Sequence, residues 1–136
     1  MSSTNSPVIV LVPGAFGTPA CFDRLLPYLK EAGLSTHPGP YPSCNPSDPT
    51  TATCSKDIAA LRDNVLLPLL DQKKDVVIIA HSYGGIPAGS AAKGLDKQAR
   101  SLEGHTSSVI GFIYVVGMMA LENESLSDVV GGSHPP

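Results

Sequence analysis

The run of apolar residues from Val76 to Ala80 is the feature that most constrains how this chain folds. Four of its five residues are β-branched, and no polar residue interrupts it. Such a run is typical of a strand buried on both faces of a parallel sheet. It leads into Ser82, followed by Gly84 and Gly85 and then by small residues compatible with a helix. A serine in this context predicts a nucleophile elbow, in which a strained strand-to-helix turn exposes the hydroxyl.

The residues that flank Ser82 agree with this prediction. The strict motif begins with glycine, and here Ala80 takes that position and is still small enough to avoid a collision across the turn. His81 is a poor candidate for the catalytic base, because successive side chains at the end of a strand point to opposite faces. We expect it to be packed and hydrogen-bonded beside the turn. The alternative for Ser82 is a plain helix N-cap, with Gly84 and Gly85 serving only the turn.

The order of elements predicts an α/β fold. Apolar periodicity predicts further strands at residues 8–12, 34–37 and 109–116, helices over 18–32, over 53–69 and after the serine, and a polar connector at 93–108. Alternating strands and helices imply about four parallel strands with helices on both faces. With the strand order 2-1-3-4, the loops after the first and third strands converge at the carboxyl edge of the sheet, where ligands bind in such folds.

Length and composition limit the classes of partner. At 136 residues we expect one domain with its own core. The net charge is −3 and no basic cluster is present, so neither nucleic acid nor an anionic membrane is an expected partner. The longest apolar stretch, residues 109–121, is shorter than the ~18 residues of a membrane span, and no signal-peptide core precedes it. We therefore expect a cytoplasmic protein.

Three cysteines, Cys21, Cys44 and Cys54, are odd in number and lack the spacing of a metal site. We expect loop or buried thiols. A disulfide between Cys44 and Cys54 is the alternative, which a cytoplasmic location disfavours. No metal and no cofactor are expected.

Two separate motifs, in order, carry a resemblance to a known family. They are residues 10–16 with the following 22–29, and residues 80–85 around the serine. On these the chain resembles the α/β-hydrolase superfamily, in the single-domain esterase branch that includes plant methylesterases and hydroxynitrile lyases. It is most similar to fungal hydrolases found with secondary-metabolite pathways. The resemblance implies a disordered polar N-terminus at 1–7, the N-terminal half of the hydrolase core at 8–120, and the start of a cap at 121–136.

The resemblance also implies roles for individual residues. Ser82 matches the nucleophile, and the backbone N–H of Tyr83 matches one donor of the oxyanion hole. The second donor matches Ala15, with Phe16 as its alternative. Pro13 stands where the family has the histidine of a His-Gly pair, a position that orients the loop. Read from the residues alone, the loop at 13–17 is equally well a strand-to-helix turn that needs glycine torsions.

The other members of the triad do not match. Family members are roughly twice as long, and their triad runs in the order serine, acid, histidine. Of the histidines that follow the serine at a distance, His105 precedes the fourth strand and His134 lies at the start of the cap, so neither matches the base. The carboxylates after the fourth strand are expected to be solvated loop residues: Glu122, Glu124 and Asp128.

These observations leave two hypotheses of different classes. The first is an enzyme that hydrolyses a small-molecule carboxylic ester through an acyl-enzyme on Ser82. The alternative is a catalytically inactive, truncated hydrolase that acts as a binding or interaction module. Lyase chemistry on cyanohydrins is a weaker third, because the lyases have a threonine where this chain has Gly14. In either case, strand 109–116 is expected at an unpaired edge of the sheet, where it favours self-association.

Overall fold

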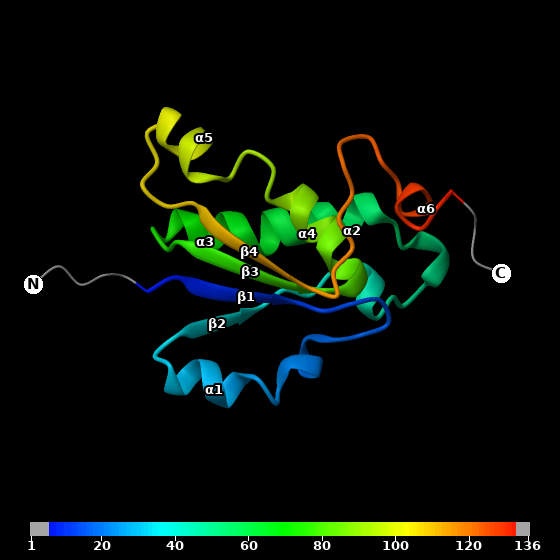
Figure 1. Cartoon of the computed structure of the whole chain (residues 1–136), viewed down its shortest axis with the longest axis horizontal. Helices are drawn as coiled ribbons and strands as arrows, with labels where there is room; N and C mark the ends of the chain where they lie inside the picture. Colours follow the sequence, from blue (N-terminus) through cyan, green and yellow to red (C-terminus); the bar gives the residue numbers. More distant parts are fainter. Residues whose placement is uncertain (1–5, 133–136) are drawn as a thin grey trace, which may run out of the picture.

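One parallel sheet organises the protein, in the order β2-β1-β3-β4 (Figure 1). The computed structural model describes residues 6–132 of the chain. The expected order of the strands is confirmed, and the α/β fold with it. The expected disorder of residues 1–7 concerns mostly residues 1–5, which lie outside the described part. The strands are β1 (Val8–Val12), β2 (Ser35–Pro38), β3 (Val76–His81) and β4 (Val109–Val115).

The register of β1 and β3 brings two loops together. The strands pair in parallel over the whole length of β1, from Val8 opposite Val76 to Val12 opposite Ala80. Their carboxyl ends therefore coincide, and the loops that follow them begin side by side. Next to β3, the pairing with β4 shifts by one residue between Val76 and Val77, which removes no pairing near the carboxyl edge.

The expected helix over residues 18–32 is divided into two pieces. A 3-10 turn, η1 (Pro19–Phe22), is followed by the short helix α1 (Leu26–Glu31). Pro27 explains the division, because a proline has no N–H to donate and is accommodated only in the first turn of a helix. A new helix therefore begins just before it.

α1 lies on one face of the sheet, and the helices of residues 54–71 and 85–91 form a layer on the opposite face (Figure 1). Residues 54–71 are helical throughout: α2 (Cys54–Leu61), the π-helical turn η4 (Arg62–Leu66) and α3 (Leu67–Asp71). The Thr53 hydroxyl accepts a hydrogen bond from the backbone N–H of Lys56 and caps α2. The remaining helices are α4 (Gly85–Ala91), α5 (Lys97–Leu102) and α6 (Leu126–Val129), with 3-10 turns η2 (Pro42–Cys44), η3 (Pro49–Thr51) and η5 (Ser82–Gly84).

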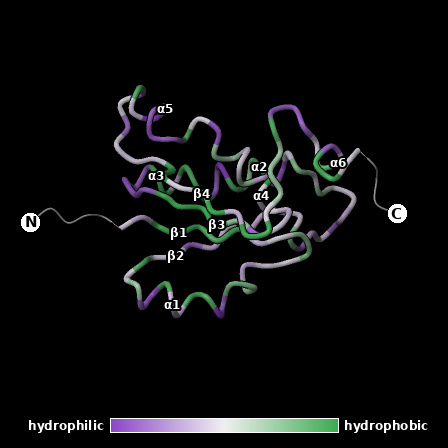
Figure 2. The backbone as a smooth tube through the Cα atoms, in the orientation of Figure 1, coloured by the Kyte–Doolittle hydropathy of each residue, from purple (hydrophilic) through white to green (hydrophobic). Residues whose placement is uncertain are grey.

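The two faces of the sheet bury different amounts of apolar surface. The larger core cluster joins one face of β1 and β3 to α2, α3 and α4, whereas the smaller one joins the other face to Phe22 and α1. Figure 2 shows hydrophobic residues along β1, β3 and β4 and hydrophilic residues around α5. Alternate side chains of the central strands thus enter opposite cores, as uninterrupted apolar runs predict.

The expectation of a polar connector at residues 93–108 is wrong in part. Helix α5 lies within it, and the Asp96 side chain caps its N-terminus by accepting a hydrogen bond from the N–H of Ala99. Arg100 is buried and donates from Nε to the carbonyl oxygen of Ser107 at 2.9 Å. The segment is polar in composition but packs, because its polar groups find partners inside the fold.

β4 forms an edge of the sheet with apolar side chains in the open. Ile113 is 50% exposed, and Ile110 and Val115 are exposed to a similar degree.

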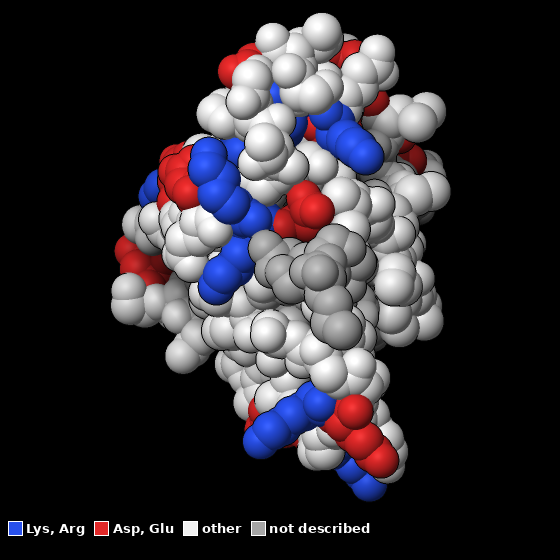
Figure 3. Space-filling view, turned by 90° about the vertical axis from the view of Figure 1, so that its left-hand side faces the viewer, with Lys and Arg blue, Asp and Glu red and all other residues white. Residues whose placement is uncertain are grey.

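Across the described residues, no helix has the length and apolar character needed to cross a membrane. In the view of Figure 3, small groups of acidic and basic side chains lie near one another on a surface that is mostly uncharged.

Candidate active site

The strand-to-helix turn expected at Ser82 is present. β3 ends at His81, a 3-10 turn follows, and α4 begins at Gly85. Ser82 has a φ of 51°, in the left-handed region that costs a residue with a Cβ about 1–2 kcal/mol. The serine is half-buried. A strained residue persists only where its surroundings hold it, and such strain concentrates at functional sites.

Three glycines allow the turn and its neighbours to approach closely. A Cβ on Gly84 would lie 2.3 Å from the carbonyl oxygen of Pro13, and one on Gly85 would lie 2.4 Å from that of Met118. A Cβ on Gly14 would lie 3.1 Å from the Cβ of Ser82. The loop after β1 is therefore pressed directly against the turn, and glycine is required at these contacts.

Backbone donors near Ser82 have no partner within the described residues. The N–H groups of Ala15, Phe16 and Tyr83 make no hydrogen bond there, while the N–H of Gly17 bonds to the Gly14 carbonyl at 3.1 Å. Phe16 has a φ of 60°, and its side chain is 96% exposed. Since fixed amide donors stabilise a developing oxyanion, this arrangement has the components of an oxyanion hole. The assignment of individual donors stays a prediction.

A buried carboxylate beside the turn was not anticipated from the sequence. Asp57, on α2, is 0% exposed. Its Oδ2 accepts a hydrogen bond from the Tyr83 hydroxyl at 2.9 Å, and its Oδ1 accepts one from the backbone N–H of Ser43 at 3.0 Å. The signal was present, because Asp57 precedes Leu61 by four residues and so shares the inward face of α2.

Tyr41 completes the polar group around the turn. Its hydroxyl donates to the carbonyl oxygen of Pro13 at 2.8 Å, and its ring packs edge-on against Tyr83 with centroids 5.9 Å apart. Burial, more than any other influence, raises the pKa of the Tyr41 hydroxyl, with the Cys44 thiol adding to it. Burial also raises the pKa of the Tyr83 hydroxyl, and hydrogen bonding with Cys54 and Asp57 adds to the effect. Both phenols therefore stay protonated and act as donors at neutral pH.

His81 does not behave as the sequence predicts. The expectation of a packed, hydrogen-bonded histidine is wrong, because the side chain is exposed and forms no hydrogen bond with any described residue. Its Nδ1 lies over Gly14, 2.9 Å from where a Cβ would be. The physical reason is Gly14, which lies beside the ring and has no side chain to cover it. Among the hydrogen bonds of residues 6–132, none joins His81 to Ser82, and its unsuitability as a base stays a prediction.

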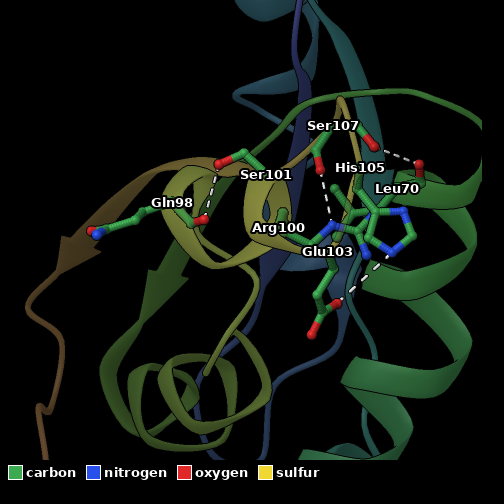
Figure 4. Close-up of polar contacts among 7 residues, drawn as sticks. All are labelled: Leu70, Gln98, Arg100, Ser101, Glu103, His105 and Ser107. Carbon is green, nitrogen blue, oxygen red and sulfur yellow. Dashed lines mark hydrogen bonds and ion pairs between the residues drawn. The ribbon is translucent and has the colours of Figure 1, made fainter.

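His105 lies at the opposite end of the sheet from the serine. It belongs to the turn between α5 and β4, before the strands begin, whereas Ser82 follows the end of β3. The six residues of β3 separate the two ends by about 17 Å. Figure 4 shows the His105 ring beside Glu103, with 3.8 Å between Nε2 and a carboxylate oxygen. His105 is therefore not the base for Ser82, and His134 lies outside the described residues.

The carboxylates after β4 serve local structure. Glu122 pairs with Lys93 at 3.0 Å, with both side chains 77% exposed. Glu124 accepts a hydrogen bond from the N–H of Leu121 at 2.7 Å. Asp128 forms a capping box with Ser125 at the start of α6, and these hydrogen bonds lower the pKa of its carboxyl. All three carboxylates are exposed, as expected, but Asp128 lies in the first turn of α6 and not in a loop.

A cleft beside the turn does not include Ser82 among its lining residues. It has a volume of about 590 Å³ and is lined by α2, α4, Tyr114 and residues 120–124.

The three cysteines are free thiols. Within residues 6–132 no group of three or more His, Cys, Asp or Glu side chains is arranged to hold a metal ion.

Comparison of the sequence with known proteins gives one consistent result. The sequence profile described as "Alpha/beta hydrolase family" matches residues 9–134. Alpha/beta hydrolase nvfD of Aspergillus novofumigatus is 29% identical over 121 residues, which make up 89% of this chain and 47% of that protein. Probable hydrolase R7 of a Phoma species is 25% identical over 128 residues, or 94% of this chain and 49% of that protein. The chain thus spans about half the length of the curated relatives it matches.

Solved structures share the fold. An extracellular alpha/beta-hydrolase from a Paenibacillus species, described as similar in structure and function to tobacco salicylic acid binding protein 2, superposes with a TM-score of 0.66 at 17% identity. The match covers 90% of this chain and 45% of that one. A variant of polyneuridine aldehyde esterase superposes with a TM-score of 0.59 at 21% identity, over 90% of this chain and 44% of that one. At these identities the likeness concerns the fold alone.

Proposed function

Because this chain belongs to the alpha/beta hydrolase family, whose profile covers residues 9–134, we propose that it is a serine hydrolase of carboxylic esters. Ser82 Oγ attacks the acyl carbon, the alcohol leaves, and water then releases the acid from the acyl-enzyme. One observation carries the proposal: Ser82 has a φ of 51° at the end of β3, beside backbone N–H groups without partners. A strained serine next to free amides is the arrangement that acyl transfer requires.

The proposed oxyanion hole has two donors. The N–H of Tyr83 follows the nucleophile directly, and the N–H of Ala15 comes from the loop held against it, with Phe16 as the alternative to Ala15. Each donor aimed at a developing oxyanion contributes about 3–4 kcal/mol to lowering the barrier. Ala80, Gly84 and Gly85 support the turn through their small size.

The proposed substrate is a small-molecule ester. A place in secondary metabolism stays a prediction of the resemblance in sequence, and the two relatives from Aspergillus and Phoma are named only as hydrolases. The resemblance implies that a cap beginning at residues 121–136 shapes the pocket, so we propose no particular acyl or alcohol group. Location in the cytoplasm stays a prediction of the sequence.

A second candidate function is a binding module without turnover. It is favoured by the surroundings of Ser82, since among residues 6–132 no histidine is hydrogen-bonded to the serine. Without a base the hydroxyl stays protonated and is a weak nucleophile.

Hydrolysis of p-nitrophenyl esters distinguishes the two candidates. We expect the 136-residue chain alone to act barely above background, because loss of the base leaves only the residual ~10³–10⁴ over water that binding and oxyanion donors supply. A chain extended to the length of the relatives should hydrolyse the esters readily and lose this activity in Ser82→Ala. The matched control is Ser90→Ala, which changes an exposed serine on α4. An inert extended chain supports the binding module, and robust hydrolysis by the short chain assigns a base among its own histidines.

A further inference from the structure

Both proposed donors of the oxyanion hole are attached to the same buried polar group. Tyr83 carries one donor on its backbone, and its side chain is held by the Asp57 carboxylate. The other donor belongs to the loop at residues 13–17, whose first carbonyl accepts the Tyr41 hydroxyl. Since the Tyr41 and Tyr83 rings pack edge-on, the two attachments form one connected unit.

Two contacts fix the Pro13 carbonyl. The Tyr41 hydroxyl donates to its oxygen at 2.8 Å in a buried position. Gly84 lies against the same oxygen, which a Cβ at that position would approach to 2.3 Å. A shift of this carbonyl would rotate the following peptides, which lead to the N–H of Ala15. The hydroxyl of Tyr41 and the backbone of Gly84 therefore determine together where that donor lies.

Two hydrogen bonds and burial hold the Asp57 carboxylate in place. It is fully buried, and its two oxygens accept hydrogen bonds from Tyr83 and Ser43, which tie α2 to the turn and to η2. Its place in the first turn of α2 adds a favourable helix dipole. Burial of a carboxylate costs free energy unless hydrogen bonds compensate for the lost water. Asp57 therefore holds its two donors in a defined geometry.

We propose that Asp57 and Tyr41 are positioning residues, which set the separation of the Tyr83 and Ala15 amides and thereby preform the oxyanion hole. This inference rests on the proposed function for its chemical meaning. Neither side chain touches the reacting atoms; each acts through the residue that it holds. A displacement of about 1 Å in such groups lowers rates by up to ~10²-fold.

Phenylboronic acid tests the proposal on the chain as it exists. A bond forms between Ser82 Oγ and boron, the hydroxyl proton passes to water, and boron becomes a tetrahedral anion with an oxygen in the proposed hole. The chain holds four tyrosines, so labelling with [15N]tyrosine gives four amide signals, of which that of Tyr83 reports on the donor itself. The variants are Asp57→Ala, Asp57→Asn and Tyr41→Phe. Tyr28→Phe, which changes an exposed tyrosine on α1, is the matched control.

Asp57→Ala and Tyr41→Phe should shift the Tyr83 amide signal in the free chain and weaken boronate binding by roughly ten- to hundred-fold. Asp57→Asn retains an acceptor for the Tyr83 hydroxyl and should restore most of both readouts, and Tyr28→Phe should change neither. An unchanged Tyr83 amide in both disruptive variants would overturn the proposal. If the wild type binds boronate through Ser82, equal boronate affinity in wild type and variants would overturn it as well.

The two proposals fail in different ways. Suppose that phenylboronic acid binds wild type and Ser82→Ala equally, while the Tyr83 amide signal still shifts in Tyr41→Phe. The positioning role is then supported, and the hydrolase proposal fails. If Asp57→Ala does not fold, Tyr41→Phe decides alone, because it removes one hydroxyl and keeps the ring.

Discussion

Replacing Gly84 by alanine tests how tightly the loop after β1 is pressed against the serine turn. Gly84 has φ −54° and ψ −22°, a right-handed conformation that alanine adopts readily. In a helix alanine is favoured over glycine by about 1 kcal/mol. Against this gain stands the Pro13 carbonyl oxygen, 2.3 Å from the new Cβ. The Pro13 oxygen is a backbone atom, and the new Cβ is bonded directly to the backbone of residue 84. Rotation of a side chain therefore cannot relieve the contact.

The expected net effect is destabilisation. Overpacking costs about 1–3 kcal/mol, and displacement of Pro13 also weakens the Tyr41 hydrogen bond, worth about 1 kcal/mol. After the propensity gain is subtracted, the free energy of unfolding should fall by about 1–3 kcal/mol. Equilibrium unfolding in urea measures it, and the midpoint should decrease by roughly 1 M at a typical slope.

Gly89→Ala, within the helix α4 that follows the turn, is the matched control. A Cβ there would meet only the Tyr114 hydroxyl, at 3.3 Å, so this variant should be as stable as wild type or more stable by up to ~1 kcal/mol. Equal stability of Gly84→Ala and Gly89→Ala would refute the close contact between loop and turn.

Two further predictions concern pH and self-association. The unfolded chain loses its tyrosine protons near the ordinary pKa of 10.0, whereas burial raises the pKa of the Tyr41 and Tyr83 hydroxyls in the folded chain. The contribution of the two tyrosines to the free energy of unfolding is therefore fully present below pH 10. Above pH 10 it should decline by up to about 1.4 kcal/mol per pH unit for each tyrosine. Urea unfolding between pH 9 and 11.5 measures this decline, and the same dependence of the free energy of unfolding on pH in the Tyr41→Phe/Tyr83→Phe variant would contradict it. Because β4 is an unpaired edge with Ile113 half exposed, the chain should self-associate, and Ile113→Lys should reduce this. Light scattering that finds wild type monomeric at high concentration would contradict the prediction.

Much of the fold follows from local patterns in the sequence. The apolar runs that become β1 and β3 have no polar residue, as expected of strands covered on both faces, whereas the apolar run of β4 lies at an edge and is partly exposed. The turn at Ser82 is likewise encoded by small residues at Ala80, Gly84 and Gly85. The contacts of these glycines in the folded chain show why larger residues would not fit.

The surroundings of the turn depend on contacts between distant parts of the chain. Asp57 and Tyr83 are 26 residues apart, and Tyr41 and Pro13 are 28 apart, so no local spacing indicates that they meet. α5 was missed for a related reason: its residues are polar, and the buried Arg100 is satisfied by a carbonyl that only the fold supplies. His81 was misjudged because strand geometry predicts the direction of a side chain but not what covers it.

Covalent labelling of Ser82 by a fluorophosphonate tests the central claim most directly. Oγ forms a bond to phosphorus, fluoride leaves, and the hydroxyl proton needs an acceptor. Imidazole added to the buffer supplies that acceptor, since no described histidine is hydrogen-bonded to Ser82. We predict slow labelling of the 136-residue chain that maps to Ser82 by peptide mass spectrometry, accelerates with imidazole concentration, and is absent in Ser82→Ala. Labelling of Ser82→Ala at the wild-type rate, or no acceleration by imidazole, would contradict a preformed nucleophile site.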